Sequence, residues 1–159
     1  MKHLPKHLRP RWRYLAVGIE TWPDAEFDRG AFQRELWYAA QNLLGDAGSA
    51  DADLTVYGFE LGLGTGEAVV RVRRGHVDEA RAALACVDAV DDDEIGVRVR
   101  GVSGTVRACE ERYLRGAAAR SEKRHVVFEG SERTAVARDD ARCVRLPSGV
   151  LGATELDFE

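Results

Sequence analysis

The order in which strand and helix patterns follow one another is the feature that most constrains the fold of this chain. Four segments have the alternation, or the β-branched and aromatic composition, that is typical of strands. They are residues 14–20, 54–61, 67–73 and 95–102. Two segments, 29–44 and 75–87, repeat apolar residues at helical spacing. The order is therefore strand, helix, strand, strand, helix, strand, and the acidic run 88–94 before the last strand is expected to be a loop.

This order predicts the α+β class, and within it a ferredoxin-like βαββαβ sandwich whose antiparallel sheet carries both helices on one face. RNA-recognition domains share that topology. Asp28 is the expected N-cap of the first helix, and Gly45 is its expected C-terminal stop. The glycine-rich loop 62–66 joins two strands and opens no helix, so we interpret it as a hairpin turn rather than a nucleotide-binding loop.

A third helix is expected after the fourth strand, from Thr105 to about Arg120, with Ser103 or Thr105 as its cap. Short strand-like segments then follow at 125–129, 134–138 and 143–146.

The chain is therefore expected to have three parts. These are a basic arm (1–13), an RNA-recognition-like α/β domain (14–120), and residues 121–159, which form either a small β appendage or a partly ordered tail. The chain has no run of 18 apolar residues that could cross a membrane, and its basic start leads into no apolar signal segment. Cys86, Cys109 and Cys143 match neither a zinc pattern nor a disulfide framework. We expect a cytoplasmic protein with reduced thiols.

The distribution of charge is more informative than the net charge of −4. Basic residues are concentrated in residues 1–20, 69–81 and 98–124, with acidic segments between them. Such blocks can converge on one partner while the acidic segments face solvent. Arginine carries nearly all of the positive charge, and its planar fork suits phosphates and base edges. A GC-rich genome or adaptation to high salt would also produce a lysine-poor chain.

Strand alternation places a basic surface on the side of the sheet away from the helices. The residues assigned to this face are Tyr14, Arg71, Arg73, Arg98 and Arg100. Together with Arg11 and Arg13 of the arm, they suit RNA, because arginine pairs with phosphate and both residue types stack on unpaired bases. The alternative is a solvated sheet face that simply carries charge. The face lacks the paired strand-centre aromatics of typical RNA-recognition domains, so charge and shape would dominate.

A second candidate surface lies where the fourth strand runs into the third helix. Ser103, Gly104 and Thr105 would present hydroxyls and free amides at a helix N-terminus, which is an anion site in many proteins. Arg107 in the first turn opposes the helix dipole and makes more sense beside an anion. Ordinary helix capping is the alternative.

The sequence offers no catalytic constellation. No general acid–base pair, nucleophile–histidine pair or metal-ligand spacing is evident. We therefore expect no catalytic residue, metal or cofactor bound by the protein itself, and an enzymatic or small-molecule-binding domain is the least supported reading.

Three segments resemble one known family. Gly101–Leu114, with its Gly-Thr-Val-Arg element, is similar to the strand-to-helix hallmark of the archaeal ribonuclease P protein component 2 family, which is related to a small subunit of the eukaryotic RNases P and MRP. Arg13-Tyr14-Leu15 and Thr65-Gly66, followed by Val69–Arg73, match its first and third strands. The resemblance covers about residues 9–120.

The resemblance implies an RNA-recognition-like fold and a subunit that supports a catalytic RNA in removing the 5′ leader of precursor tRNA. It implies Mg²⁺ held by the RNA. It also implies as partners ribonuclease P RNA and other protein subunits, chiefly protein component 3, with which the chain would form a dimer of heterodimers. The residues carried over are Arg13, Tyr14, Thr65, Gly66, Gly104, Thr105 and Arg107. The alternative is a protein–protein interaction module of the same fold without direct RNA contact.

Overall fold

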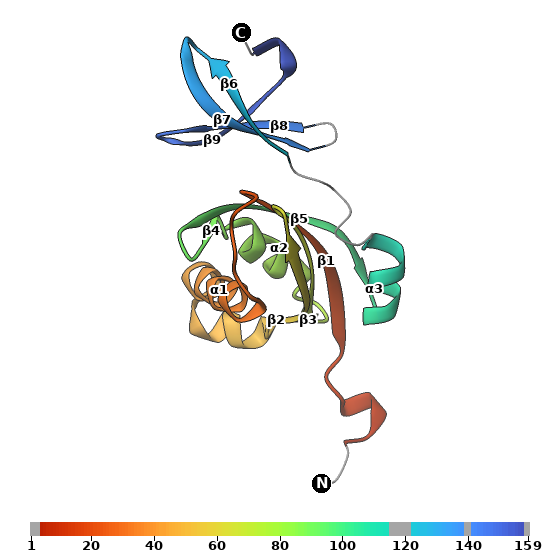
Figure 1. Cartoon of the computed structure of the whole chain (residues 1–159). Helices are drawn as coiled ribbons and strands as arrows, with labels where there is room; N and C mark the ends of the chain where they lie inside the picture. The colour runs from red at the N-terminus through yellow and green to blue at the C-terminus, as the bar shows by residue number, and fades with distance from the viewer. Residues whose placement is uncertain (1–3, 115–121, 139–140, 158–159) are drawn as a thin grey trace.

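A five-stranded antiparallel sheet forms the centre of the computed structural model, which describes residues 4–114, 122–138 and 141–157. The strand order is β2-β3-β1-β5-β4. The strands are β1 (Trp12–Thr21), β2 (Thr55–Gly62), β3 (Thr65–Arg73), β4 (Ala89–Val90) and β5 (Asp93–Ser103). A 3-10 turn, η1 (Lys6–Leu8), lies in the arm that precedes β1 and extends away from the sheet (Figure 1).

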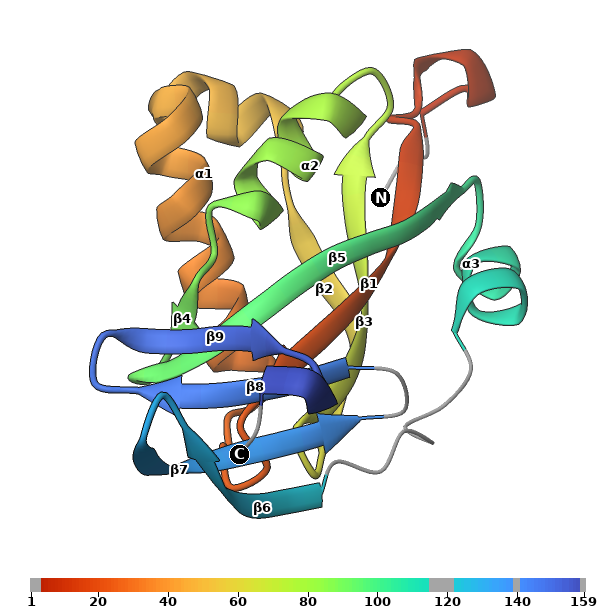
Figure 2. The ribbon, with the colours of Figure 1, turned by 90° about the horizontal axis from the view of Figure 1, so that it is seen from above.

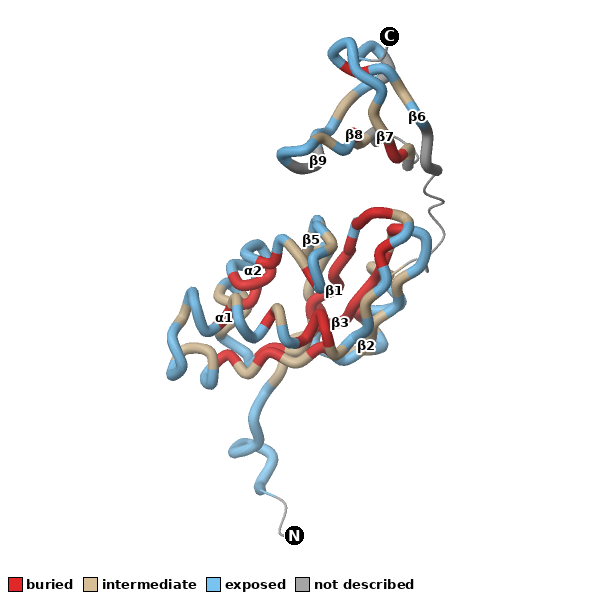
Figure 3. The backbone as a smooth tube through the Cα atoms, turned by 60° about the vertical axis from the view of Figure 1, so that its left-hand side comes forward, coloured by how far each residue is buried: buried red, intermediate tan, exposed pale blue. Residues whose placement is uncertain are grey.

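Two helices, α1 (Arg29–Ala52) and α2 (Val77–Ala85), cover one face of this sheet (Figure 2). The main hydrophobic core lies between the sheet and these helices, where buried residues of β1 and β3 meet those of α1 and α2 (Figure 3). Leu15, Val17 and Ile19 of β1 point into this core, as their alternation predicts. Phe32 and Leu36 of α1 are completely buried against them. The order of the elements and the antiparallel pairing confirm a mixed α and β protein.

Helix α1 begins as predicted, because the Asp28 carboxylate accepts a hydrogen bond of 2.8 Å from the Ala31 amide. The prediction that it ends at Gly45 is only partly right. Gly45 leaves helical geometry (φ 73°, ψ 174°), but helical structure resumes and continues to Ala52. The chain resumes the helix because Ala52 is buried in the main core, and Asp53 then ends it in the left-handed conformation.

The loop between β2 and β3 is the predicted hairpin. Leu63 and Gly64 both have positive φ, at 53° and 81°. Two consecutive residues of this kind form the two-residue turn whose twist matches antiparallel strands.

The acidic segment 88–94, predicted to be a loop, is instead the tight turn of a second hairpin. Ala89 and Val90 pair with Glu94 and Asp93. Asp91 and Asp92 make the turn with φ of 48° and 67°, a conformation that aspartate tolerates better than most residues. Strand β5 therefore starts two residues earlier than predicted.

A third helix, α3 (Val106–Tyr113), lies on the opposite face of the sheet from α1 and α2 (Figure 2). Of the two predicted caps, Ser103 and Thr105, it is Thr105 that caps the helix, and its hydroxyl accepts a hydrogen bond of 3.1 Å from the Ala108 amide. The helix ends at Tyr113 rather than near Arg120, because Leu114 is already extended; residues 115–121 lie outside the described residues. Ala16, Val69 and Cys109 are buried beneath it. The sheet face predicted to be open is thus partly covered.

Burial of Cys109 leads to a first prediction. Burial, assisted by Glu110, raises the pKa of this thiol from 9.0 to about 11, so its reactive thiolate is scarce near neutral pH. In the folded chain, iodoacetamide at about pH 8 should modify the exposed Cys86 and spare Cys109. Because the thiolate is favoured in the unfolded chain, the free energy of unfolding should fall as pH rises from about 9 to about 11. Equal labelling of both thiols, read by mass spectrometry, would contradict the burial beneath α3.

A second, four-stranded antiparallel sheet lies within the described residues 122–138 and 141–157. Its strands are β6 (Glu122–Phe128), β7 (Ser131–Arg138), β8 (Ala141–Leu146) and β9 (Gly149–Ala153), followed by the 3-10 turn η2 (Glu155–Asp157). The segments predicted as strands at 125–129, 134–138 and 143–146 overlap β6, β7 and β8, and β9 is one strand more than predicted. Phe128, Ala135 and Val144 form the small core of this sheet.

The second sheet contacts the main domain at the segment that follows β1. Val136 packs with Trp22 and Ala25 in a small buried cluster. The Arg145 guanidinium lies 4.8 Å from the centre of the Trp22 ring. Within the described residues, none of the helices has the length and apolar character needed to span a membrane.

Candidate nucleic-acid interface

Helix α3 divides the second face of the main sheet into a covered part and an uncovered part. The covered part contains Ala16, Val69 and Gly101, over which α3 packs. The uncovered part lies where β1 starts and β3 ends, with β2 beside them. Five side chains meet there and form what we call the aromatic–arginine cluster. Its members are Trp12, Tyr14, Tyr57, Arg71 and Arg73.

Arg71 is the centre of this cluster. Its guanidinium carbon lies 3.8 Å from the centre of the Trp12 ring and 5.2 Å from that of Tyr57. One of its terminal nitrogens donates a hydrogen bond of 3.3 Å to the Tyr57 hydroxyl. The planar group is thus stacked on an indole and held in one orientation, which arginine does better than lysine.

Arg73 lies at the end of β3 and is exposed. Its guanidinium is 5.6 Å from the Trp12 ring and 3.8 Å from the Asp53 carboxylate, with the two charged side chains 46% and 42% exposed. An ion pair this long and this exposed contributes little stability and can be exchanged for another anion.

The arm continues this basic surface at the same end of the sheet. The Arg11 carbonyl accepts a hydrogen bond of 2.8 Å from the Arg74 amide. Arg11, Arg73 and Arg74 line one shallow depression, together with His76. The predicted residues Arg11 and Arg73 are therefore neighbours although they lie far apart in the sequence.

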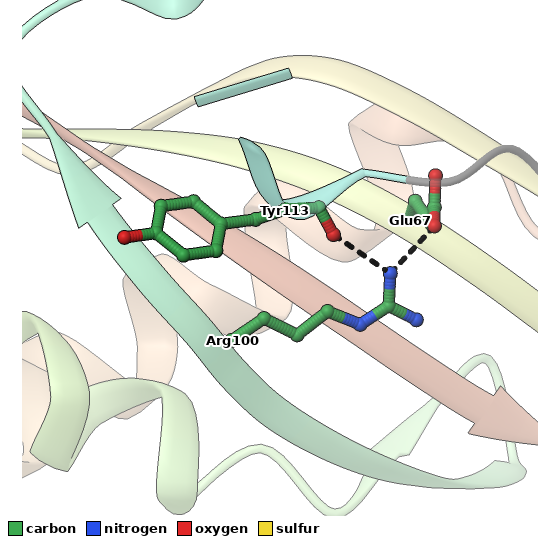
Figure 4. Close-up of polar contacts among 3 residues, drawn as sticks. All are labelled: Glu67, Arg100 and Tyr113. Carbon is green, nitrogen blue, oxygen red and sulfur yellow. Dashed lines mark hydrogen bonds and ion pairs between the residues drawn. The ribbon is translucent and has the colours of Figure 1, made fainter. Parts of the chain in front are cut away.

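Arg100 is committed to an interaction within the protein. Its guanidinium forms an ion pair of 2.5 Å with the Glu67 carboxylate and donates at 3.4 Å to the Tyr113 carbonyl at the end of α3 (Figure 4). The Glu67 side chain is only 8% exposed and that of Arg100 29% exposed. A buried carboxylate requires such a partner, so Arg100 both compensates the charge of Glu67 and fastens α3 to the sheet. Arg98, two residues earlier on β5, is exposed.

The predicted anion site surrounds the start of α3. Arg13 lies beside Gly104, with one guanidinium nitrogen 3.2 Å from the position that a Cβ would occupy there. Thr105 caps the helix, and Arg107 forms an exposed ion pair of 2.8 Å with Glu111 one turn later. Ser103 is 7% exposed, and its hydroxyl makes no hydrogen bond within residues 4–114 or the described parts of the second sheet. The structure thus brings Arg13 to this site.

Sequence reasoning missed Trp12 and Tyr57. Trp12 precedes the segment predicted as the first strand by two residues, so extending that strand would have placed it beside Tyr14. Tyr57 also had a local signal, because Leu54 and Val56 face the core and alternation then places Tyr57 on the outer face. The signal is obscured by Phe59, which also packs against the core because the register between β2 and β3 shifts between Val56 and Gly58.

The described residues hold no group of three or more histidine, cysteine, aspartate or glutamate side chains placed to bind a metal ion. The side chains that meet in the aromatic–arginine cluster are of types that bind phosphates and bases.

Comparisons with known proteins agree on one family. The sequence profile of the Rpp14/Pop5 family matches residues 13–114. Ribonuclease P protein component 2 of Halorubrum lacusprofundi is 66% identical over 159 residues, covering 100% of both chains. The protein of the same name from Haloarcula marismortui is 64% identical and covers 99% of both. That of Methanosarcina acetivorans is 36% identical over 72% of this chain and 83% of its own.

A solved structure of the C-terminal domain of a cyclometallase covers 92% of this chain with 9% identity and a TM-score of 0.24, which is too low to support a conclusion. The family profile ends at Leu114, whereas the alignments with the Halorubrum and Haloarcula proteins extend through the second sheet. The chain belongs to the Rpp14/Pop5 family.

Proposed function

We propose that this chain is a protein subunit of ribonuclease P, which supports the catalytic RNA in removing the 5′ leader from precursor tRNA. The observation that carries this proposal is the 66% identity, over the whole of both chains, with a protein named ribonuclease P protein component 2. The strand order β2-β3-β1-β5 with α1 and α2 on one face supports a ferredoxin-like βαββαβ arrangement, which RNA-recognition domains share.

In this function the chain binds RNA and carries no catalytic residue of its own. The RNA-binding surface comprises the uncovered sheet face and the start of α3. Its residues are Arg11, Arg13, Tyr14, Arg71, Arg73, Arg98, Ser103, Gly104, Thr105 and Arg107. Arg100 acts indirectly, by keeping α3 in place. Arginines that neutralise phosphates lower the repulsion between packed RNA helices, while Mg²⁺ for the reaction is held by the RNA.

Other protein subunits are expected partners, chiefly protein component 3, with a dimer of heterodimers as the expected assembly in the cytoplasm. Support for a protein-binding surface comes from α1, where Trp37, Tyr38 and Leu43 are 48%, 56% and 46% exposed. Large exposed apolar side chains of this kind are typical of protein interfaces. The arm (1–13), the α/β domain (14–120) and the appendage (121–159) would then contribute separate surfaces.

A reconstitution tests the function. Ribonuclease P RNA and the other subunits are mixed with and without the chain, and cleavage of precursor tRNA is followed by gel electrophoresis. Omitting the chain should reduce 5′ cleavage at moderate Mg²⁺, and additional Mg²⁺ should restore part of it, because a cation can replace part of the phosphate neutralisation. Cleavage that does not depend on the chain would refute the proposed function.

The second candidate is a protein–protein module without RNA contact. The exposed aromatic residues of α1 and the net charge of −4 favour it. Chemical footprinting of the RNA distinguishes the two: a module that contacts only protein leaves the RNA footprint of the other subunits unchanged when it is added.

A further inference from the structure

We propose that the aromatic–arginine cluster is a binding site for one unpaired nucleotide of RNA, with its base stacked on Tyr57 and its phosphate held by Arg71 and Arg73. This inference rests on the proposed function, because it assumes that the protein meets RNA. It adds a specific ligand class, the flipped-out or looped nucleotide. The positive charge of the surface by itself would suit any RNA.

Tyr57 is the side chain available for stacking. It stands on β2, an edge strand, next to the core-facing Val56, so its side chain lies on the outer face beside Arg71, and it is 50% exposed. Tyr14 meets its ring nearly at a right angle, at 86° and 5.9 Å between centroids. Edge-to-face packing fixes an aromatic ring, and fixing it in advance reduces the entropy lost when a ligand stacks on it.

Arg71 and Arg73 are the anion-binding groups next to this ring. Arg71 is stacked on Trp12 and hydrogen-bonded to Tyr57, yet its buried Nε has no hydrogen-bond partner within the described residues. The guanidinium of Arg73 lies 3.8 Å from the carboxylate of the half-exposed Asp53. A phosphate oxygen can replace this long ion pair. An oriented arginine and an exchangeable one therefore flank a half-exposed aromatic ring.

An unpaired nucleotide fits this arrangement better than a double helix. An RNA duplex keeps its bases stacked internally and offers mainly phosphates and 2′-hydroxyls, which make no use of an exposed tyrosine. Duplex binding by phosphate contacts alone also requires many positive charges, and this chain has a net charge of −4. Stacking supplies free energy that salt does not screen, whereas exposed charge pairs weaken as the Debye length falls to about 3 Å at 1 M salt.

The test compares two fluorescently labelled probes, a single-stranded oligoadenylate and an RNA duplex of equal length, by fluorescence anisotropy with the full-length chain. Tyr57→Ala should weaken binding of the single strand by roughly 5- to 100-fold and leave duplex binding within about twofold. Tyr57→Phe should bind the single strand almost as well as the unaltered chain, because it keeps the ring. Leu63→Ala is the control, since Leu63 is 66% exposed in the turn between β2 and β3 and belongs to neither proposed binding surface.

Each other outcome overturns the site. An affinity for the single strand that Tyr57→Ala leaves unchanged would refute stacking on this ring, while RNA binding and the proposed function would stand. Equal weakening for both probes would indicate a structural role for Tyr57. No binding of either probe by the unaltered chain would also refute the site, and the reconstitution would then decide the proposed function separately. If Tyr57→Ala binds the single strand normally but no longer assembles with the other protein subunits, the cluster belongs to a protein interface.

Discussion

Gly101→Ala is expected to lower the free energy of unfolding by roughly 1–3 kcal/mol, the usual cost of overpacking. A Cβ at this position would lie 2.3 Å from two ring carbons of Tyr113, well inside contact distance. The ring packs from α3 onto the sheet beside Val69 and Cys109, so it has little freedom to give way. Either Tyr113 is expelled or β5 shifts, and both weaken the attachment of α3. Chemical unfolding followed by circular dichroism measures the change.

Two further variants make this prediction specific. Gly96→Ala is the matched control, because Gly96 is also in β5 and a Cβ there meets no atom within 4 Å. The double variant Gly101→Ala, Tyr113→Ala should be more stable than the sum of the two single effects predicts, because removing the ring removes the clash. Equal stability of the Gly101 and Gly96 variants would show that Tyr113 does not hold α3 in this position.

Changing Arg71, Arg73 and Arg107 together to glutamine is expected to weaken binding of ribonuclease P RNA by at least about tenfold at low salt. For each phosphate that is no longer neutralised, the slope of log affinity against log salt should also become shallower by about 0.7 to 0.9. Glutamine keeps much of the side-chain volume, so the fold should survive, which thermal unfolding checks. Filter binding over a series of salt concentrations measures both quantities.

The control for this triple variant is the pair Arg34→Gln and Arg81→Gln. Both arginines are exposed, and they lie on α1 and α2, on the other side of the sheet. Their removal changes the net charge of the chain, but the slope of log affinity against log salt should stay nearly that of the unaltered chain. If the two sets of substitutions weaken binding equally per charge, RNA binding depends on general electrostatics and the proposed surface is wrong.

Local patterns predicted most of the secondary structure correctly. The caps at Asp28 and Thr105 and the hairpin at Leu63-Gly64 are confirmed, because each depends on one or two side chains and on backbone conformations that few residues adopt. The inner face of β1 also follows directly from its alternation. The prediction for segment 88–94 was wrong, because its acidic composition conceals a turn that Val90, fully buried, anchors to the core.

The candidate site was predicted less well than the elements that carry it. The prediction that Arg100 points to the outer face is correct. The sequence around Arg100 does not indicate that Glu67 on β3 is its partner. The apolar residues Ala16 and Val69 on the outer face were local signals that something would cover the sheet there, since buried apolar side chains require a covering element. Tyr57 was missed because the register shift lets both Val56 and Phe59 face the core, which hides the alternation of β2.

The sequence by itself determined the order β1, α1, β2, β3, α2, β5, the core-facing side of β1 and the family of the chain, because these depend on periodicity and on short local motifs. Only the tertiary structure decided which outward-facing arginines are free. Arg71 and Arg100 both lie on the outer face of the sheet, yet one meets aromatic rings and the other a buried carboxylate. That difference arises because each side chain's environment is made by neighbouring strands and by α3, which are distant in sequence and come together only when the sheet forms.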